Sequence, residues 1–148
     1  MTRTANDFDS SDVAKTLLAI QPRWFQSTLT FFALTALFLV VLQLDNRLLD
    51  GVSVWSKPLK FSLSLAVYFG TLLLMARLLP VGQLNSGRHH TIAVSLIFVA
   101  AFEMAYIAIQ AMLGETSHFN KSTPFHSIMY SLMGIGAIWL TVGLAWLA

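Results

Sequence analysis

The chain contains no cysteine, and only 11% of its 148 residues are charged. Without cysteine there can be no disulfide, thiolate metal site or iron–sulfur cluster, and the redox compartment cannot be read from the sequence. Charged residues make up about 25% of an ordinary soluble domain. Because the chain is also 56% hydrophobic, with a mean hydropathy of +0.69, the shortage of charge predicts an integral membrane protein.

Nine Lys and Arg residues against seven Asp and Glu give a formal net charge of +2, but the basic residues do not gather on one face. They are spread over the ends of the apolar runs, so we expect no nucleic-acid partner. The expected partner is the lipid bilayer. At about 20 apolar residues per span, the length allows roughly three to five membrane helices and no second domain.

Prolines and one glycine divide residues 24–148 into four apolar runs. The prolines stand before the first run, at both ends of the second and at the start of the fourth: Pro22, Pro58, Pro80 and Pro124. Thr123 is the expected N-cap of the last run, and Gly114 the residue that ends the third. The fold class is therefore predicted to be all-α, an antiparallel four-transmembrane-helix bundle. The predicted spans are about 24–44, 58–79, 91–113 and 124–148.

Residues 1–23 form a polar segment without the apolar core of a cleavable secretion signal. Ser11 can cap a short amphipathic helix, which we expect to lie at the membrane surface from Ser11 to Gln21. Its apolar face would consist of Val13, Leu17 and Ile20. The alternative is a frayed tail, because helices this short are marginal without packing.

The basic residues indicate the orientation only weakly. On the expected layout the side of the termini carries Arg3, Lys15, Arg23, Arg77 and Arg88, and the other side carries Arg47, Lys57, Lys60 and Lys121. We expect a multi-pass protein of the cell membrane with cytoplasmic termini, and a dual-topology dimer is the alternative. The middle loop, Val81 to His90, is expected to be a short cytoplasmic turn with His89 and His90 in solvent.

Glu103 is the only carboxylate inside a long apolar run. A charge at membrane depth costs several kcal/mol, so such a residue indicates a functional site. It shares a helix face with Tyr106 and Gln110, at i, i+3 and i+7. We expect Glu103 to be protonated near neutral pH and hydrogen-bonded across the bundle, with Tyr68 as its first candidate partner.

Two further helices carry polar stripes. The stripe of the second helix contains Lys57, Lys60, Ser64, Tyr68 and Thr71, and that of the fourth contains His126, Tyr130, Met133, Ala137 and Thr141. On the opposite face of the second helix, Ser62, Ala66 and Gly70 form a ridge of small residues that permits close helix packing. We expect the stripes to share an interior. The alternative is that Ser64 and Thr71 bond to their own helix and that the lysines reach the headgroups.

A polar mouth is expected where the first and third loops meet. Lys60, His118 and His126 are predicted to share this pocket, with Glu103 at its floor. Lys57, Asn120 and Lys121 would lie nearby. Because two helix N-termini point into the mouth, an anion is the expected occupant. Glu115, His118 and His126 could bind a divalent metal there, although their spacing matches no established zinc motif, and no other cofactor is predicted.

Three functions remain open from the sequence. The first is proton-coupled transport or conduction of a small polar or anionic solute through Glu103. The second is a membrane enzyme, or a site for a lipid headgroup, small ligand or metal at the mouth, formed by Lys60, Glu115, His118 and His126. The third is a structural subunit, in a homo-oligomer or a larger membrane complex.

Overall fold

The computed structural model describes residues 22–79, 81–84, 86–116 and 123–147. Its helices are α2 (Pro22–Leu44), α3 (Ser56–Ala76), the single-turn α4 (Val81–Leu84), α5 (Gly87–Leu113) and α6 (Pro124–Leu147). Two short strands, β1 (Leu48–Leu49) and β2 (Val52–Ser53), form a hairpin between α2 and α3. The helix expected from Ser11 to Gln21 lies outside the described residues.

Four of these helices are long and apolar enough to cross a membrane: α2, α3, α5 and α6. The starts of α2, α3 and α5 and the end of α3 differ from the predicted spans by two to four residues, most at the start of α5 and the end of α3. Helix α5 begins at Gly87, four residues before the predicted start, because Ser86 caps it by accepting a hydrogen bond from the His89 backbone N–H (3.2 Å). Helix α3 ends at Ala76, since the next backbone N–H groups bond three residues back in a tighter turn.

Two predicted end signals are present. The side-chain oxygen of Thr123 accepts a hydrogen bond from the backbone N–H of His126 (3.2 Å) at the start of α6. Gly114 ends α5 with a φ of 72°, a left-handed conformation that glycine adopts without steric cost.

The hairpin between α2 and α3 was not predicted from the sequence. Its turn is Asp50–Gly51, with φ values of 52° and 78°. Leu48 pairs with Ser53 and Leu49 with Val52. An Asp-Gly pair between short apolar stretches is a strong signal for such a turn, so the sequence does contain the information.

Helices α2 and α3 form the most extensive contact between two helices. The ridge of small residues on α3 makes it possible, because Ser62 and Ala66 are fully buried and Thr35 of α2 donates a hydrogen bond to the Ser62 hydroxyl (3.0 Å). Phe69 of α3 stacks with Phe31 of α2, with ring centroids 5.4 Å apart. Close packing of α3 through its small face therefore agrees with the prediction.

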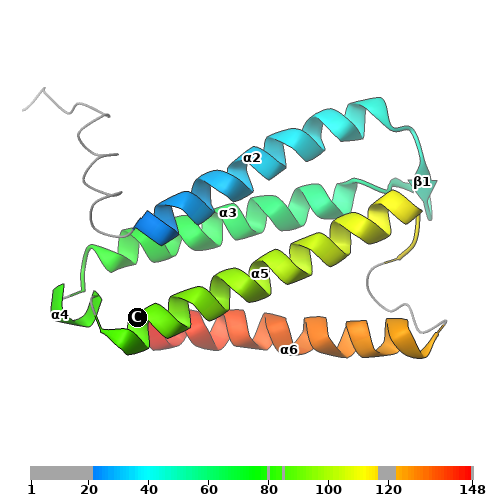
Figure 1. The fold of residues 1–148 in the computed structure, drawn as a ribbon. Helices are drawn as coiled ribbons and strands as arrows, with labels where there is room; N and C mark the ends of the chain where they lie inside the picture. The colour runs from blue at the N-terminus through cyan, green and yellow to red at the C-terminus, as the bar shows by residue number, and fades with distance from the viewer. Residues whose placement is uncertain (1–21, 80, 85, 117–122, 148) are drawn as a thin grey trace, which may run out of the picture.

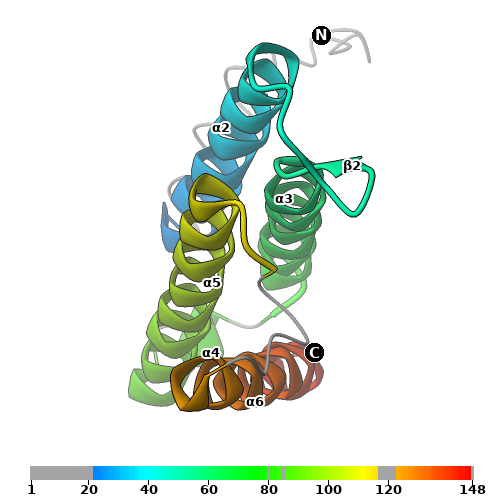
Figure 2. The same cartoon turned by 90° about the vertical axis from the view of Figure 1, so that its right-hand side faces the viewer.

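The long helices run alternately up and down (Figure 1). The hairpin, the end of α5 and the start of α6 lie at one end of the molecule, here called the hairpin end, and α4 lies at the other, the α4 end. Helix α6 packs against α5 near the α4 end, and the two diverge toward the hairpin end. Seen from the hairpin end, α6 lies beneath α3 and α5, on the side of the molecule away from α2 (Figure 2).

Candidate functional site

The carboxyl group of Glu103 is buried between α5 and α6. The residue is 2% exposed, and its Oε1 has no hydrogen-bond partner among the described residues. The group lies against Gly136 of α6, where an added Cβ would overlap Oε1 and would lie 3.0 Å from Val99 Cγ1. The absence of a side chain at position 136 is therefore what allows the carboxyl group to fit between the helices.

Glu103 lines two clefts, one on each side of α6. The first, here called the α5–α6 cleft, has a volume of about 480 Å³ and is lined by Phe98, Val99, Phe102, Glu103, Leu132, Ile135, Gly136 and Trp139. The second, the α3–α6 cleft, has a volume of about 310 Å³; its polar lining consists of Ser64, Tyr68, Glu103 and Thr141. One buried acid thus contacts an apolar cleft on one side and a more polar one on the other.

Tyr68 does not bond to Glu103, so the predicted partnership is wrong. Its hydroxyl donates instead to the backbone carbonyl of Leu140 in α6, at 2.8 Å. A carbonyl oxygen has two lone pairs, so it can accept this bond in addition to a helical one. Tyr68 and Glu103 do line the same cleft.

Most of the predicted polar stripe on α3 does not face a closed interior. Ser64 donates to the carbonyl of Lys60 and Thr71 to that of Val67, each at 2.9 Å. Lys57, Lys60, Ser64 and Thr71 are exposed. A hydroxyl in apolar surroundings can satisfy its hydrogen bond within its own helix, and this alternative describes Ser64 and Thr71.

The polar face of α5 is buried along its length. Tyr106 and Gln110 are 8% and 3% exposed, and Gln110 Nε2 donates to the Tyr106 hydroxyl at 2.8 Å. Gln110 Oε1 has no partner among the described residues. With Glu103, these side chains form a row of buried polar groups leading toward the hairpin end.

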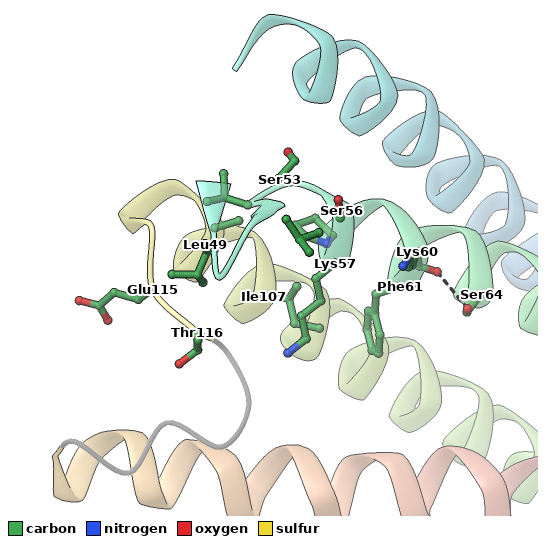
Figure 3. A pocket seen from close by; sticks show the side chains of 14 residues that line it. Leu49, Ser53, Ser56, Lys57, Lys60, Phe61, Ser64, Ile107, Glu115 and Thr116 are labelled. Carbon is green, nitrogen blue, oxygen red and sulfur yellow. Dashed lines mark hydrogen bonds between the residues drawn. The ribbon is translucent and has the colours of Figure 1, made fainter. Parts of the chain in front are cut away.

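A cavity of about 610 Å³ opens at the hairpin end, here called the mouth cavity (Figure 3). Its polar lining consists of Ser53, Ser56, Lys57, Lys60, Ser64, Glu115 and Thr116. Figure 3 shows the Lys57 side chain passing close to Ile107, while the Glu115 carboxylate extends away from both. Phe61 and Ser64 line the α3–α6 cleft as well, so the two cavities adjoin along α3.

The predicted pocket of Lys60, His118 and His126 is described only in part. Lys60 and Glu115 line the mouth cavity, and His126 Nε2 lies 3.2 Å from Glu115 Oε2. Half-buried Tyr130 follows one turn later on α6. His118, Asn120 and Lys121 lie outside the described residues.

Three metal ligands were predicted. Glu115 and His126 are in contact, and His118 lies outside the described residues. No group of three or more His, Cys, Asp or Glu side chains suited to a metal occurs within the part of the chain that the structure describes. The two described ligands do not make a metal site on their own, since zinc sites use three or four protein ligands.

Sequence reasoning missed a polar cluster that holds the hairpin to α5. The Arg47 guanidinium makes a bidentate ion pair with Asp45, and Trp55 Nε1 donates to the same carboxylate at 2.7 Å. Arg47 Nη1 also donates to the carbonyl of Met112 (2.9 Å) at the end of α5. The hydrogen bonds from Arg47 and then from Trp55 hold the pKa of the Asp45 carboxyl well below its usual range, and the same ion pair raises the pKa of Arg47. The only signal in the sequence is the spacing of two residues between opposite charges.

The expectation that His89 is solvated is wrong. It is 7% exposed and meets Trp24 edge-on, with ring centroids 6.0 Å apart, because the early start of α5 turns it toward α2. His90, the next residue, is exposed. The Arg88 guanidinium lies over the Trp146 ring, 4.4 Å from its centroid, and so joins the start of α5 to the end of α6.

Burying an ionised carboxylate without a partner is costly, so a group placed like Glu103 is stable as a neutral acid or with a cation beside it. This arrangement can exchange a proton for another charge. Comparisons of the chain with models of known protein families, with curated proteins and with solved structures gave no match.

Proposed function

We propose that the chain is an integral membrane protein in which α2, α3, α5 and α6 cross the bilayer as an antiparallel bundle. Their lengths and hydropathy support this, and many of their large apolar side chains are exposed, as lipid contact requires. The hairpin end faces outward and the α4 end faces the cytoplasm of the cell. This orientation puts both ends of the four-helix region on the cytoplasmic side.

Cysteine labelling tests this topology against a clean background, since the natural chain has no cysteine. Suitable exposed positions are Asn46 and Thr116 at the hairpin end and Gln83 at the α4 end. In intact cells a membrane-impermeant maleimide should label Asn46→Cys and Thr116→Cys, and it should label Gln83→Cys only after permeabilisation. Labelling of all three from outside would contradict the proposal, and half-labelling of each would indicate dual insertion.

Within this protein, Glu103 is proposed to exchange protons during transport of a small polar or anionic solute. The observation that carries the proposal is a carboxyl group that is 2% exposed, lines two clefts and has no bonding partner for Oε1 among the described residues. A purely structural acid in such a place would be expected to have its hydrogen bonds satisfied. An intramembrane acid with an unsatisfied carboxyl oxygen suits a proton-relay role.

The route to Glu103 would begin at the mouth cavity. Lys57 and Lys60 line this cavity and would favour an anion or a polar solute over a cation. The solute would pass Phe61 and Ser64 into the α3–α6 cleft, where Tyr68 and Glu103 meet it. Glu103 would carry a proton together with the solute.

Proteoliposomes containing a trapped pH-sensitive dye test the transport step. With inorganic phosphate or acetate as the probe, the wild-type protein should carry protons down an imposed pH gradient faster than empty vesicles do, and Glu103→Gln should abolish the difference. Asp50→Asn is the matched control, because it also removes one carboxylate and asparagine tolerates the positive φ at that turn. Equal proton flux in wild type and Glu103→Gln would refute the transport proposal.

A structural role is the second candidate, and the placement of α6 favours it. Within the described residues α6 packs mainly on α5 and only weakly against α3, apart from the hydrogen bond between Tyr68 and Leu140. A helix of another subunit could cover the exposed side of α6. Native mass spectrometry of the purified protein would then find a second helical chain, whereas a protein that carries phosphate or acetate by itself would be found alone or as copies of itself.

A further inference from the structure

The α5–α6 cleft has a different chemistry from the mouth cavity. Its walls include the aromatic rings of Phe98, Phe102 and Trp139, and Glu103 is its one ionisable side chain. The Trp139 ring is held in place, because its Nε1 donates to the Ser95 hydroxyl at 3.1 Å. At about 480 Å³ the cleft is within the range of cavities that bind drug-sized molecules, roughly 300–1,000 Å³.

These walls select against most polar solutes. No Lys, Arg or His lines the cleft, so an anion finds no opposite charge there. A strongly hydrated metal cation requires several oxygen ligands, and one carboxyl group cannot replace its water. A bulky organic cation has little water to lose, and its charge is attracted both by aromatic faces and by an ionised carboxylate.

We infer that the α5–α6 cleft binds a hydrophobic monovalent organic cation, with Glu103 as its counter-charge. Binding replaces one proton: the neutral acid releases H⁺, and the resulting carboxylate balances the charge of the cation. The α3–α6 cleft offers the proton a separate exit, past Tyr68 and Thr141. The inference builds on the proposed proton exchange at Glu103 and names a class of ligand for the apolar side of the same residue.

Few other groups can supply or remove charge at this position. The titratable residues that line the two clefts are Glu103 and, on α3, Tyr68, whose hydroxyl is bonded to Leu140. Helix α6 contributes no titratable residue to either lining. Tyr106 is the nearest ionisable neighbour on α5, and it accepts a hydrogen bond from Gln110. Competition between proton and cation should therefore follow Glu103.

Equilibrium binding of radiolabelled tetraphenylphosphonium to the purified protein in detergent tests the inference. Wild-type protein should bind it saturably, more weakly as the pH falls, and with release of about one proton in unbuffered solution. Glu103→Gln should weaken binding about thirtyfold or more, as expected when one partner of a desolvated charge pair is removed. Tetraphenylborate, an anion of the same shape, should not compete.

Glu103→Gln could lose binding because it fails to fold, so a second, milder pair of variants tests the cleft independently. Phe98→Leu removes one aromatic wall of the cleft and should weaken binding about fivefold through the lost cation–π attraction. Phe32→Leu is the matched control, because Phe32 is an exposed aromatic residue of α2 that does not line the cleft. No saturable binding by wild type, equal binding by Phe98→Leu and Phe32→Leu, or binding that does not change with pH would each overturn the inference.

The two proposals can fail separately. Proton flux that depends on Glu103, in a protein that does not bind tetraphenylphosphonium, would overturn the inference and leave the transport proposal standing. Binding that depends on Glu103, in vesicles with no proton flux, would support a cation site in a protein that is not a transporter.

Discussion

The Glu103 carboxyl group of α5 lies against Gly136 of α6, with the Val99 side chain beside it. A Cβ at Gly136 would overlap Oε1, whereas a Cβ at Gly134, half a turn earlier on α6, would meet nothing within 4 Å. Two glycines close together on one helix therefore provide a test and its control.

Gly136→Ala is expected to destabilise the protein by about 1 kcal/mol or more, because the added methyl group must displace the carboxyl group or push the helices apart. Gly134→Ala should be neutral or stabilising by up to about 1 kcal/mol, since alanine is the better helix former. Unfolding of both variants in detergent, followed by circular dichroism, measures the difference. Equal stability would contradict the placement of Glu103 against α6.

Glu103 should be a neutral acid near neutral pH, because its burial disfavours a negative charge without a partner. Infrared difference spectroscopy should show the C=O stretch of a protonated acid that is lost in Glu103→Gln. Tyr68→Phe should keep the band, since the Tyr68 hydroxyl bonds to Leu140 and not to the acid. A spectrum already without the band in mildly acidic solution would refute the prediction.

Tyr68→Phe should weaken the attachment of α6 to α3. The lost hydrogen bond to Leu140 should cost about 0.6 kcal/mol, the average measured for such bonds between membrane helices. Thr71→Val is the control, because the Thr71 hydroxyl bonds only within its own helix, to Val67. In detergent, Thr71→Val should have the same free energy of unfolding as wild type, and Tyr68→Phe should have a lower one.

The ion pair between Asp45 and Arg47 should make stability depend on acid pH. The pKa of Asp45 lies below its ordinary value of 3.8 in the folded state, so the carboxylate stabilises the fold fully above that value. The contribution disappears as the pH falls through the lowered pKa. The stability difference between wild type and Asp45→Asn should therefore be constant near neutral pH and shrink below about pH 4. A difference that grows in acid would contradict this linkage.

The sequence by itself determined the helices. Apolar runs, prolines and end signals such as Thr123 and Gly114 act through local chemistry, so four helices appear where they were predicted, with boundary errors of two to four residues that are largest at Gly87 and Ala76. The small face of α3 was likewise readable, because close packing of helices depends on residue size at a fixed spacing. The burial of Glu103, Tyr106 and Gln110 follows from the same periodicity.

Only the tertiary structure decided which partners these residues find. The choice of Leu140 by Tyr68, and the position of Gly136 against Glu103, depend on the angle and register between helices far apart in sequence. The same is true of Arg47 and Met112, which are 65 residues apart. Helical periodicity fixes the face of a side chain but not the depth and rotation of the helix that it meets. The division of the space around Glu103 into an apolar and a polar cleft is therefore a property of the packing.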